Sequence, residues 1–224
     1  SSDLFWYSSG RYQNQNGGDN VLVSRLTYNG VVGQSGELFG RIDSPYNVFV
    51  KGLVGAGGLS RGSMYDEDWG LGGNLTTIAT SYEVTIPAGT SLARFELFET
   101  DVAPGSDFDL FVYFDGEEAG RSAGGTANER VDLADPDPGT YTVYVHNWAS
   151  ETPTSPFKLY HWILGTASAG NLSVTAPASA TLGGSGTISL TTSGLMTGTK
   201  YLGAVVYGGG AALAKPTIVR VDIP

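Results

Sequence analysis

The chain has 224 residues, enough for one large or two to three small β domains, and it is rich in glycine, with 33 residues. Only 15% of its residues are charged, against about 25% in an average soluble protein. The net charge is −10, and residues 70–165 hold 14 acidic and 4 basic side chains. This excess of negative charge argues against nucleic acid and anionic membrane surfaces as partners. It permits a divalent cation or a basic partner.

The composition favours strands over helices. Thr, Val, Ser, Tyr and Gly dominate, and these residues build strands joined by tight turns. No apolar run approaches the ~20 residues that a transmembrane helix requires. The chain has no cysteine, so disulfides do not indicate a compartment. An all-β fold in three blocks follows.

The first block, residues 1–70, contains three strand-length alternating runs, at 21–28, 37–43 and 46–54. Asn29-Gly30 and Ser44-Pro45 separate them, and such pairs form turns because they supply a positive or a fixed φ. This pattern predicts an N-terminal antiparallel β-meander.

The second block, residues 71–166, has the clearest pattern. Six strands are predicted, at 81–86, 92–98, 108–114, 130–133, 141–148 and 157–163. Turn signals separate them, among them Asp115-Gly116 and the Pro-rich segment 135–139. This spacing indicates a β-sandwich. Alternation assigns seven residues to its core: Phe95, Leu97, Leu110, Val112, Tyr141, Val143 and Val145.

The third block, residues 167–224, has four predicted strands at 171–175, 187–190, 200–207 and 217–223, separated by glycine clusters. It is typical of a small immunoglobulin-like or fibronectin-like module. Since about 58 residues is short for such a fold, we expect it to pack against a neighbour.

From about residue 82 to the end, the sequence resembles the C-terminal accessory region of secreted bacterial subtilisin-like serine proteases. Four stretches carry the resemblance: 84–95 (VTIPAGTSLARF), 106–113 (SDFDLFVY), 139–148 (GTYTVYVHNW) and 198–207 (GTKYLGAVVY). The middle two are similar to the pre-peptidase C-terminal domain. The resemblance implies a jelly-roll-like antiparallel β-sandwich in a secreted protein. Residues 40–52 and 62–69 resemble strands of a proteobacterial outer-membrane β-barrel instead, although three or four strands cannot close a barrel.

One motif resembles a catalytic element. Gly89-Thr-Ser-Leu-Ala93 is similar to the segment around a subtilisin-type nucleophile. That chemistry requires a histidine base and an orienting aspartate. Here Ser91 leads into a predicted strand, and both histidines, His146 and His161, lie downstream on predicted strands. We therefore expect no catalytic residue in this chain.

Two binding sites are predicted. Asp101, Asp107, Asp109 and Asp115 gather around one loop and one strand, and such oxygen-rich segments bind Ca²⁺; the alternative is that they keep strand ends soluble. The aromatic residues Tyr144, Trp148, Tyr160 and Trp162 form a candidate stacking surface for a sugar or a peptide, with core packing as the alternative.

The sequence leads to a functional hypothesis: a non-catalytic accessory region of a secreted subtilisin-like protease, located outside the cell or on its surface. Its partners would be a protein or peptide substrate or a cell-surface polymer, and its strand edges would permit self-association. Three alternatives stay open. They are a structural or adhesive surface subunit, a carbohydrate-binding module, and a fragment of an outer-membrane β-barrel.

Overall fold

The computed structural model describes residues 11–13, 21–27, 47–55, 60–65, 75–152, 154–176, 185–208 and 216–224. Within these ranges lie fifteen β-strands, one four-residue helix, α1 (Leu75–Ile78), and one 3₁₀ turn, η1 (Glu99–Asp101). The prediction of an all-β fold is confirmed. The predicted strand at 37–43 lies outside the described residues.

The chain divides into two compact units, not three blocks. Unit 1 combines Ser1–Gly55 with Ala167–Pro224, and unit 2 is the continuous segment Ala56–Thr166 between them. The predicted boundary near residue 70 therefore differs from the observed one at residues 55 and 56. The first and third blocks belong to one unit because their strands pair with each other, which a reading in chain order does not anticipate.

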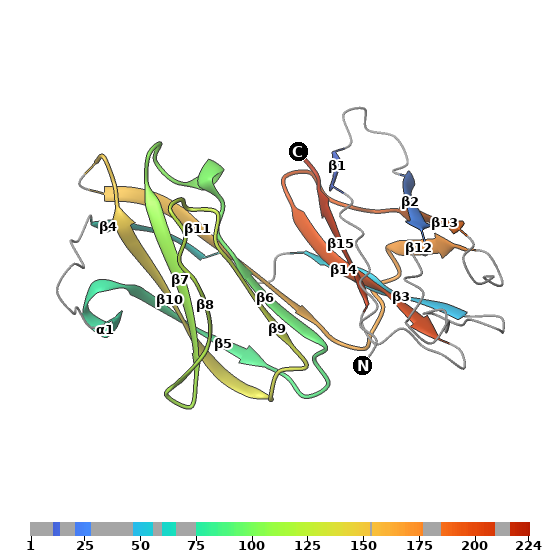
Figure 1. Cartoon of the computed structure of the whole chain (residues 1–224), viewed down its shortest axis with the longest axis horizontal. Helices are drawn as coiled ribbons and strands as arrows, with labels where there is room; N and C mark the ends of the chain where they lie inside the picture. The colour runs from blue at the N-terminus through green and yellow to red at the C-terminus, as the bar shows by residue number, and fades with distance from the viewer. Residues whose placement is uncertain are drawn as a thin grey trace, which may run out of the picture. The chain divides into compact units, whose positions relative to one another are not determined.

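Unit 2 contains two four-stranded antiparallel sheets (Figure 1). The first, called the β7 sheet, has the order β5 (Thr80–Ile86), β10 (Gly139–Ala149), β7 (Asp107–Phe114) and β8 (Glu117–Ser122). The second, called the β6 sheet, has the order β4 (Ser60–Tyr65), β11 (Thr154–Leu164), β6 (Leu92–Glu96) and β9 (Arg130–Ala134).

Both sheets of unit 2 turn apolar side chains into one core, so the unit is sandwich-like. All seven core residues predicted from alternation belong to that core cluster. Phe108, Phe157 and Leu159 join them and are also almost fully buried. Burying each such side chain stabilises the fold by about 1.5–3 kcal/mol, so this core fixes which face of each strand points outward.

The β7–β8 hairpin turns at Asp115-Gly116, as the sequence predicts. Both residues have positive φ, 50° and 82°, which matches the two-residue turns that join antiparallel strands with their natural twist. The strand that follows, β8, was not predicted. Its sequence EEAGRS has no apolar alternation, and none of its residues is buried.

A second special backbone position, Gly139, begins β10 beside an aromatic pair. Its φ is 152°, a conformation that costs L-residues about 1–3 kcal/mol. The rings of Phe114 and Tyr141 stack next to it with centroids 4.5 Å apart. A Cβ added at Gly139 would lie 2.6 Å from Phe114 Cε2.

We expect Gly139→Ala to destabilise unit 2 by about 2–4 kcal/mol, because overpacking adds to the backbone strain. The matched control is Gly116→Ala, whose φ is also positive but whose Cβ would meet no atom within 4 Å. It should cost only about 1–2 kcal/mol. Urea unfolding of both variants measures the difference, and equal losses would contradict the steric argument.

Unit 1 also contains two sheets. One has the order β1 (Arg11–Gln13), β15 (Thr217–Asp222), β14 (Lys200–Gly208) and β3 (Asn47–Gly55), in which only the β1–β15 pair is parallel. The other has the order β12 (Leu172–Thr175), β13 (Ser185–Thr192) and β2 (Val21–Thr27). Among the side chains that the structure describes, its core cluster includes Leu190, Tyr201 and Val221.

The predicted N-terminal meander is wrong for the described strands. Strand β2 pairs with β13 and strand β3 pairs with β14, so the two lie in different sheets. Alternation correctly predicted that both segments are extended. Alternation contains no information on which strands pair. The strands of the short third block pair with the N-terminal strands.

An ion-pair cluster ties β14 to β15. Arg220 donates two hydrogen bonds to Asp222, of 2.9 and 2.6 Å, and Lys200 Nζ lies 3.5 Å from the same carboxylate. Burial alone would raise the pKa of Asp222, but the hydrogen bonds and charges of Arg220 and Lys200 outweigh it and hold the pKa below its ordinary value. Asp222 is therefore ionised at neutral pH.

Candidate binding face on the β7 sheet

The outer face of the β7 sheet carries a group of aromatic side chains. In the ladder between β7 and β10, Tyr144 pairs with Phe111 and Thr142 pairs with Tyr113. These residues alternate with core residues of the same strands, so they point away from the core. The Tyr113 and Tyr144 rings meet edge to face, with centroids 5.7 Å apart and planes at 89°.

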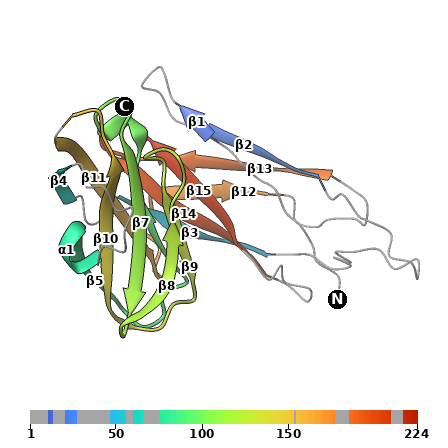
Figure 2. The same ribbon diagram turned by 60° about the vertical axis from the view of Figure 1, so that its left-hand side comes forward.

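A pocket of about 530 Å³ opens over this face, within the range typical of ligand sites. Helix α1, which lies beside β10, contributes Leu75 and Thr76 (Figure 2). The β7–β8 turn contributes Asp115 and Gly116. The full lining comprises Leu75, Thr76, Phe111, Tyr113, Asp115, Gly116, Glu118, Arg121, Thr142 and Tyr144.

Strand β8 brings two opposite charges to this pocket. Arg121 Nε lies 3.6 Å from Glu118 Oε1, and their side chains are 66% and 38% exposed. An ion pair this exposed contributes little to stability. Both groups can therefore turn their hydrogen-bonding atoms toward a ligand. Together they offer a donor and an acceptor beside the aromatic rings.

Trp148 extends the aromatic surface along β10. The ladder with β7 shifts register between Asn147 and Ala149, which makes Trp148 the extra residue of a β-bulge. The buried Asn147 amide fits the bulge when it is turned so that its nitrogen, rather than its oxygen, faces the neighbouring carbonyls. In that orientation the nitrogen donates to the carbonyls of Ala149 (2.9 Å) and Asp107 (3.2 Å). Trp148 is 44% exposed, although large apolar side chains are usually buried.

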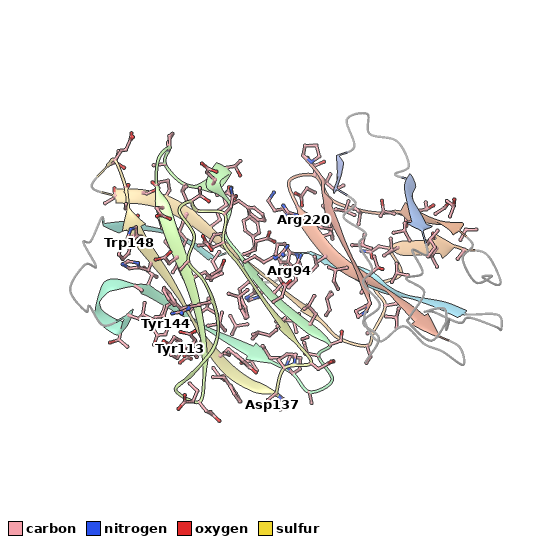
Figure 3. The ribbon with its side chains drawn as sticks, viewed as in Figure 1. Arg94, Tyr113, Asp137, Tyr144, Trp148 and Arg220 are labelled. Atoms are coloured by element: carbon pink, nitrogen blue, oxygen red, sulfur yellow. The ribbon has the colours of Figure 1, made fainter. Side chains whose placement is uncertain are left out.

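Tyr113, Tyr144 and Trp148 follow one another along the sheet (Figure 3) and are called the aromatic row from here on. Beside them lies His146, fully buried, with its ring 6.2 Å from that of Trp148 and its Nδ1 3.6 Å from Asp109 Oδ2. His146 alternates with the core residue Val145, so it lies between Tyr144 and Trp148 on the outer face, and its burial means that the sheet is covered at this point. Pre-organised aromatic rings lose little conformational entropy when they bind a ligand.

The four aspartates proposed as calcium ligands do not meet at one point. Asp107 and Asp109 are close together at the start of β7, but Asp115 follows its last residue, about 20 Å from Asp109 and about 27 Å from Asp107 along the strand. Asp101 is already bound, by Lys158 Nζ at 2.6 Å and by the Tyr160 hydroxyl at 3.1 Å. Within the described parts of the chain, no group of three or more His, Cys, Asp or Glu residues is placed to hold a metal ion.

The predicted aromatic surface is also divided. Tyr144 and Trp148 lie in the β7 sheet, whereas Tyr160 and Trp162 lie on β11 in the β6 sheet. The latter two stack with centroids 5.9 Å apart, and both are buried. The grouping of all four is therefore wrong, because the chain changes sheet between β10 and β11. Tyr113, Glu118 and Arg121 were not predicted as site residues, because no alternation or motif in the sequence marks them.

Ser91 is held by the backbone. Its Oγ donates to the carbonyl of Leu164 at 3.0 Å, and its own carbonyl accepts from the Asp135 amide at 3.1 Å. The histidines lie elsewhere in unit 2: His146 is on the β7 sheet, and the His161 ring packs edge-on against Phe95. These two hydrogen bonds connect the start of β6 to the end of β11 and to the residue after β9.

Comparison with known protein families and with curated proteins finds no match to this chain. In the part of the chain that the structure describes, no helix is both long enough and apolar enough to cross a bilayer.

Asp107 has a raised pKa, so the stability of the protein should depend on pH through this group. Burial is the largest cause, the negative charges of Asp109 and Glu129 add to it, and the charge of His146 opposes it. Because the folded state favours protonated Asp107, its contribution to stability is full at low pH and is lost as pH rises through the raised pKa.

We expect Asp107→Asn to raise the melting temperature at neutral pH by about 1–2 °C, as a fraction of a kcal/mol would in a chain of this size. The gain should vanish below the ordinary pKa of 3.8, where the wild-type carboxyl is also neutral. Differential scanning fluorimetry across pH measures it. The control is Asp115→Asn in the exposed turn, where Asn is equally tolerated at positive φ. A lower melting temperature for Asp107→Asn at neutral pH would contradict the electrostatic argument.

Proposed function

We propose that this chain is a non-catalytic binding module, the accessory region of a secreted subtilisin-like protease, and that it holds its parent protein on a polymeric substrate or cell surface. The observation that carries the proposal is the pocket beside the aromatic row on the outer face of the β7 sheet. The protease context is what the sequence resemblance implies. We also propose, on the same resemblance, that the protein acts outside the cell or on its surface.

The composition of the pocket supports binding. Ligand sites combine aromatic surface with a few polar groups that fix orientation, and this pocket has Phe111, Tyr113 and Tyr144 beside Glu118 and Arg121. The rings stand on the two central strands of a sheet whose other face is a packed core. The packed core holds these rings in position before any ligand binds. Little conformational entropy is then lost on binding, which favours a binding role.

The shape of the site supports a polymer as the ligand. Tyr144 and Trp148 are four residues apart on β10, so the aromatic row extends about 13 Å, and Trp148 lies beyond the residues that line the pocket. A ligand that contacts both Tyr144 and Trp148 must pass over the buried His146, so it must be longer than a single small molecule. A polymer chain meets this requirement.

The surroundings of Ser91 support the absence of catalysis. A serine nucleophile needs its hydroxyl directed at a histidine base, whereas the Ser91 hydroxyl is directed at a backbone carbonyl. The segment Gly89-Thr-Ser-Leu-Ala93 forms a turn and the start of β6, with no helix following it.

The binding proposal predicts adsorption that depends on the aromatic row. We expect the protein to be depleted from solution by at least one insoluble polymer in a panel of collagen, elastin, cellulose and chitin. Tyr144→Ala should weaken this adsorption about tenfold, because an aromatic contact contributes about 0.5–1.5 kcal/mol beyond its buried area. Tyr144→Phe keeps the ring and should retain most of the affinity.

The control for that experiment is Met196→Ala, which removes an exposed apolar side chain from unit 1. It should leave adsorption unchanged. Near-ultraviolet circular dichroism should show that Tyr144→Ala is folded. If the protein binds no polymer, insoluble or soluble, or if Tyr144→Ala and Met196→Ala behave alike, the binding proposal is refuted.

The absence of catalysis has its own test. We expect the purified chain to release no fluorescent peptides from labelled casein above the level of a buffer blank. Ser91→Ala is the diagnostic variant. Casein cleavage by the wild type that Ser91→Ala abolishes would show that this chain is an enzyme.

A further inference from the structure

We propose that the ligand of the β7 sheet is a neutral polysaccharide chain, with sugar rings against Tyr113 and Tyr144 and sugar hydroxyls on Glu118 and Arg121. This inference rests on the proposed binding function and names the ligand class for the same site. Three observations carry it: the location of the site within the sheet, its polar groups, and its charge.

The location disfavours a peptide strand as the ligand. Extended peptides gain affinity by pairing their backbone with the free edge of a sheet. The site lies over β7 and β10, which are the two central strands and are hydrogen-bonded on both sides. Their backbone groups are occupied by the ladders with β5 and β8. A ligand here must bind through side chains.

The available side chains fit a sugar. The C–H bonds on one face of a pyranose ring carry partial positive charge, and aromatic faces are negative, so the two surfaces attract each other. Sugar hydroxyls both donate and accept hydrogen bonds. Glu118 supplies an acceptor and Arg121 supplies donors 3.6 Å away, a spacing that suits two neighbouring hydroxyls. Thr142 adds a hydroxyl to the same lining.

The charge of the site argues for a neutral ligand. Asp115 and Glu118 face one cationic group, Arg121, among the residues that line the pocket. The chain as a whole carries −10. Polymers rich in uronate or sulfate would be repelled by this field. The length of the aromatic row indicates a ligand of more than one sugar unit, because Trp148 can contact a second sugar ring of the same polysaccharide.

The experiment measures binding to a printed array of neutral and acidic glycans together with insoluble cellulose, chitin, collagen and elastin. The expected result is binding to neutral glycans of several sugars, with weaker binding to single sugars. Glu118→Ala and Arg121→Ala should each weaken it roughly threefold to tenfold, the effect of one or two lost hydrogen bonds. Trp148→Ala should weaken binding of long chains more than of short ones.

Two matched controls accompany these variants. Glu117→Ala removes the neighbouring exposed carboxylate on β8, which is not part of the pocket lining. Arg130→Ala removes a guanidinium of similar exposure, 56%, from β9 in the β6 sheet. Both controls should bind like the wild type, which separates local contacts from a general change in charge.

The outcomes separate this inference from the proposed function. Adsorption to collagen or elastin that depends on Tyr144, without binding to any glycan, overturns the polysaccharide assignment and leaves the binding function in place. Preference for acidic glycans also overturns it. Absence of adsorption to every polymer and glycan refutes both. Glycan binding that is unaffected by Glu118→Ala and Arg121→Ala contradicts the proposed site.

Discussion

The register of the ladder between β7 and β10 is the constraint on which unit 2 depends. Val143 opposite Val112 and Val145 opposite Leu110 place apolar pairs in the core. The same register places Tyr144 opposite Phe111 on the outer face. A shift by one residue would exchange the two faces, burying Tyr144 and exposing the valines, which the free energy of apolar burial forbids. The core thus determines the position of the binding face.

Local irregularities then shape that face. The Asp115-Gly116 turn folds β8 back along β7 and brings Glu118 and Arg121 to the rings. At the other end of the ladder, the bulge held by Asn147 presents Trp148 to solvent. A regular sheet would carry neither feature at these points. Turns and bulges commonly direct side chains toward ligands because they change the direction of the strand without disturbing the core.

The order of the units along the chain explains why a reading by blocks gave the wrong organisation for the ends. Unit 2 occupies the middle of the sequence, and its strands pair only with one another in the described ladders. The first and last segments combine because each is too short to bury a core alone.

The sequence by itself determined the strands, the turns and the inward faces of unit 2, because alternation and turn chemistry are local properties. Tyr141, Val143 and Val145 show this, since each was assigned to the core from its position in the run. Only the tertiary structure decided the partners. It separated Trp148 from Trp162 and joined Tyr113 to Tyr144. Strand β8 is the clearest case, since its polar sequence has no apolar periodicity and only its hairpin partner makes it a strand. Sheet membership depends on contacts between residues distant in sequence, which no local pattern contains.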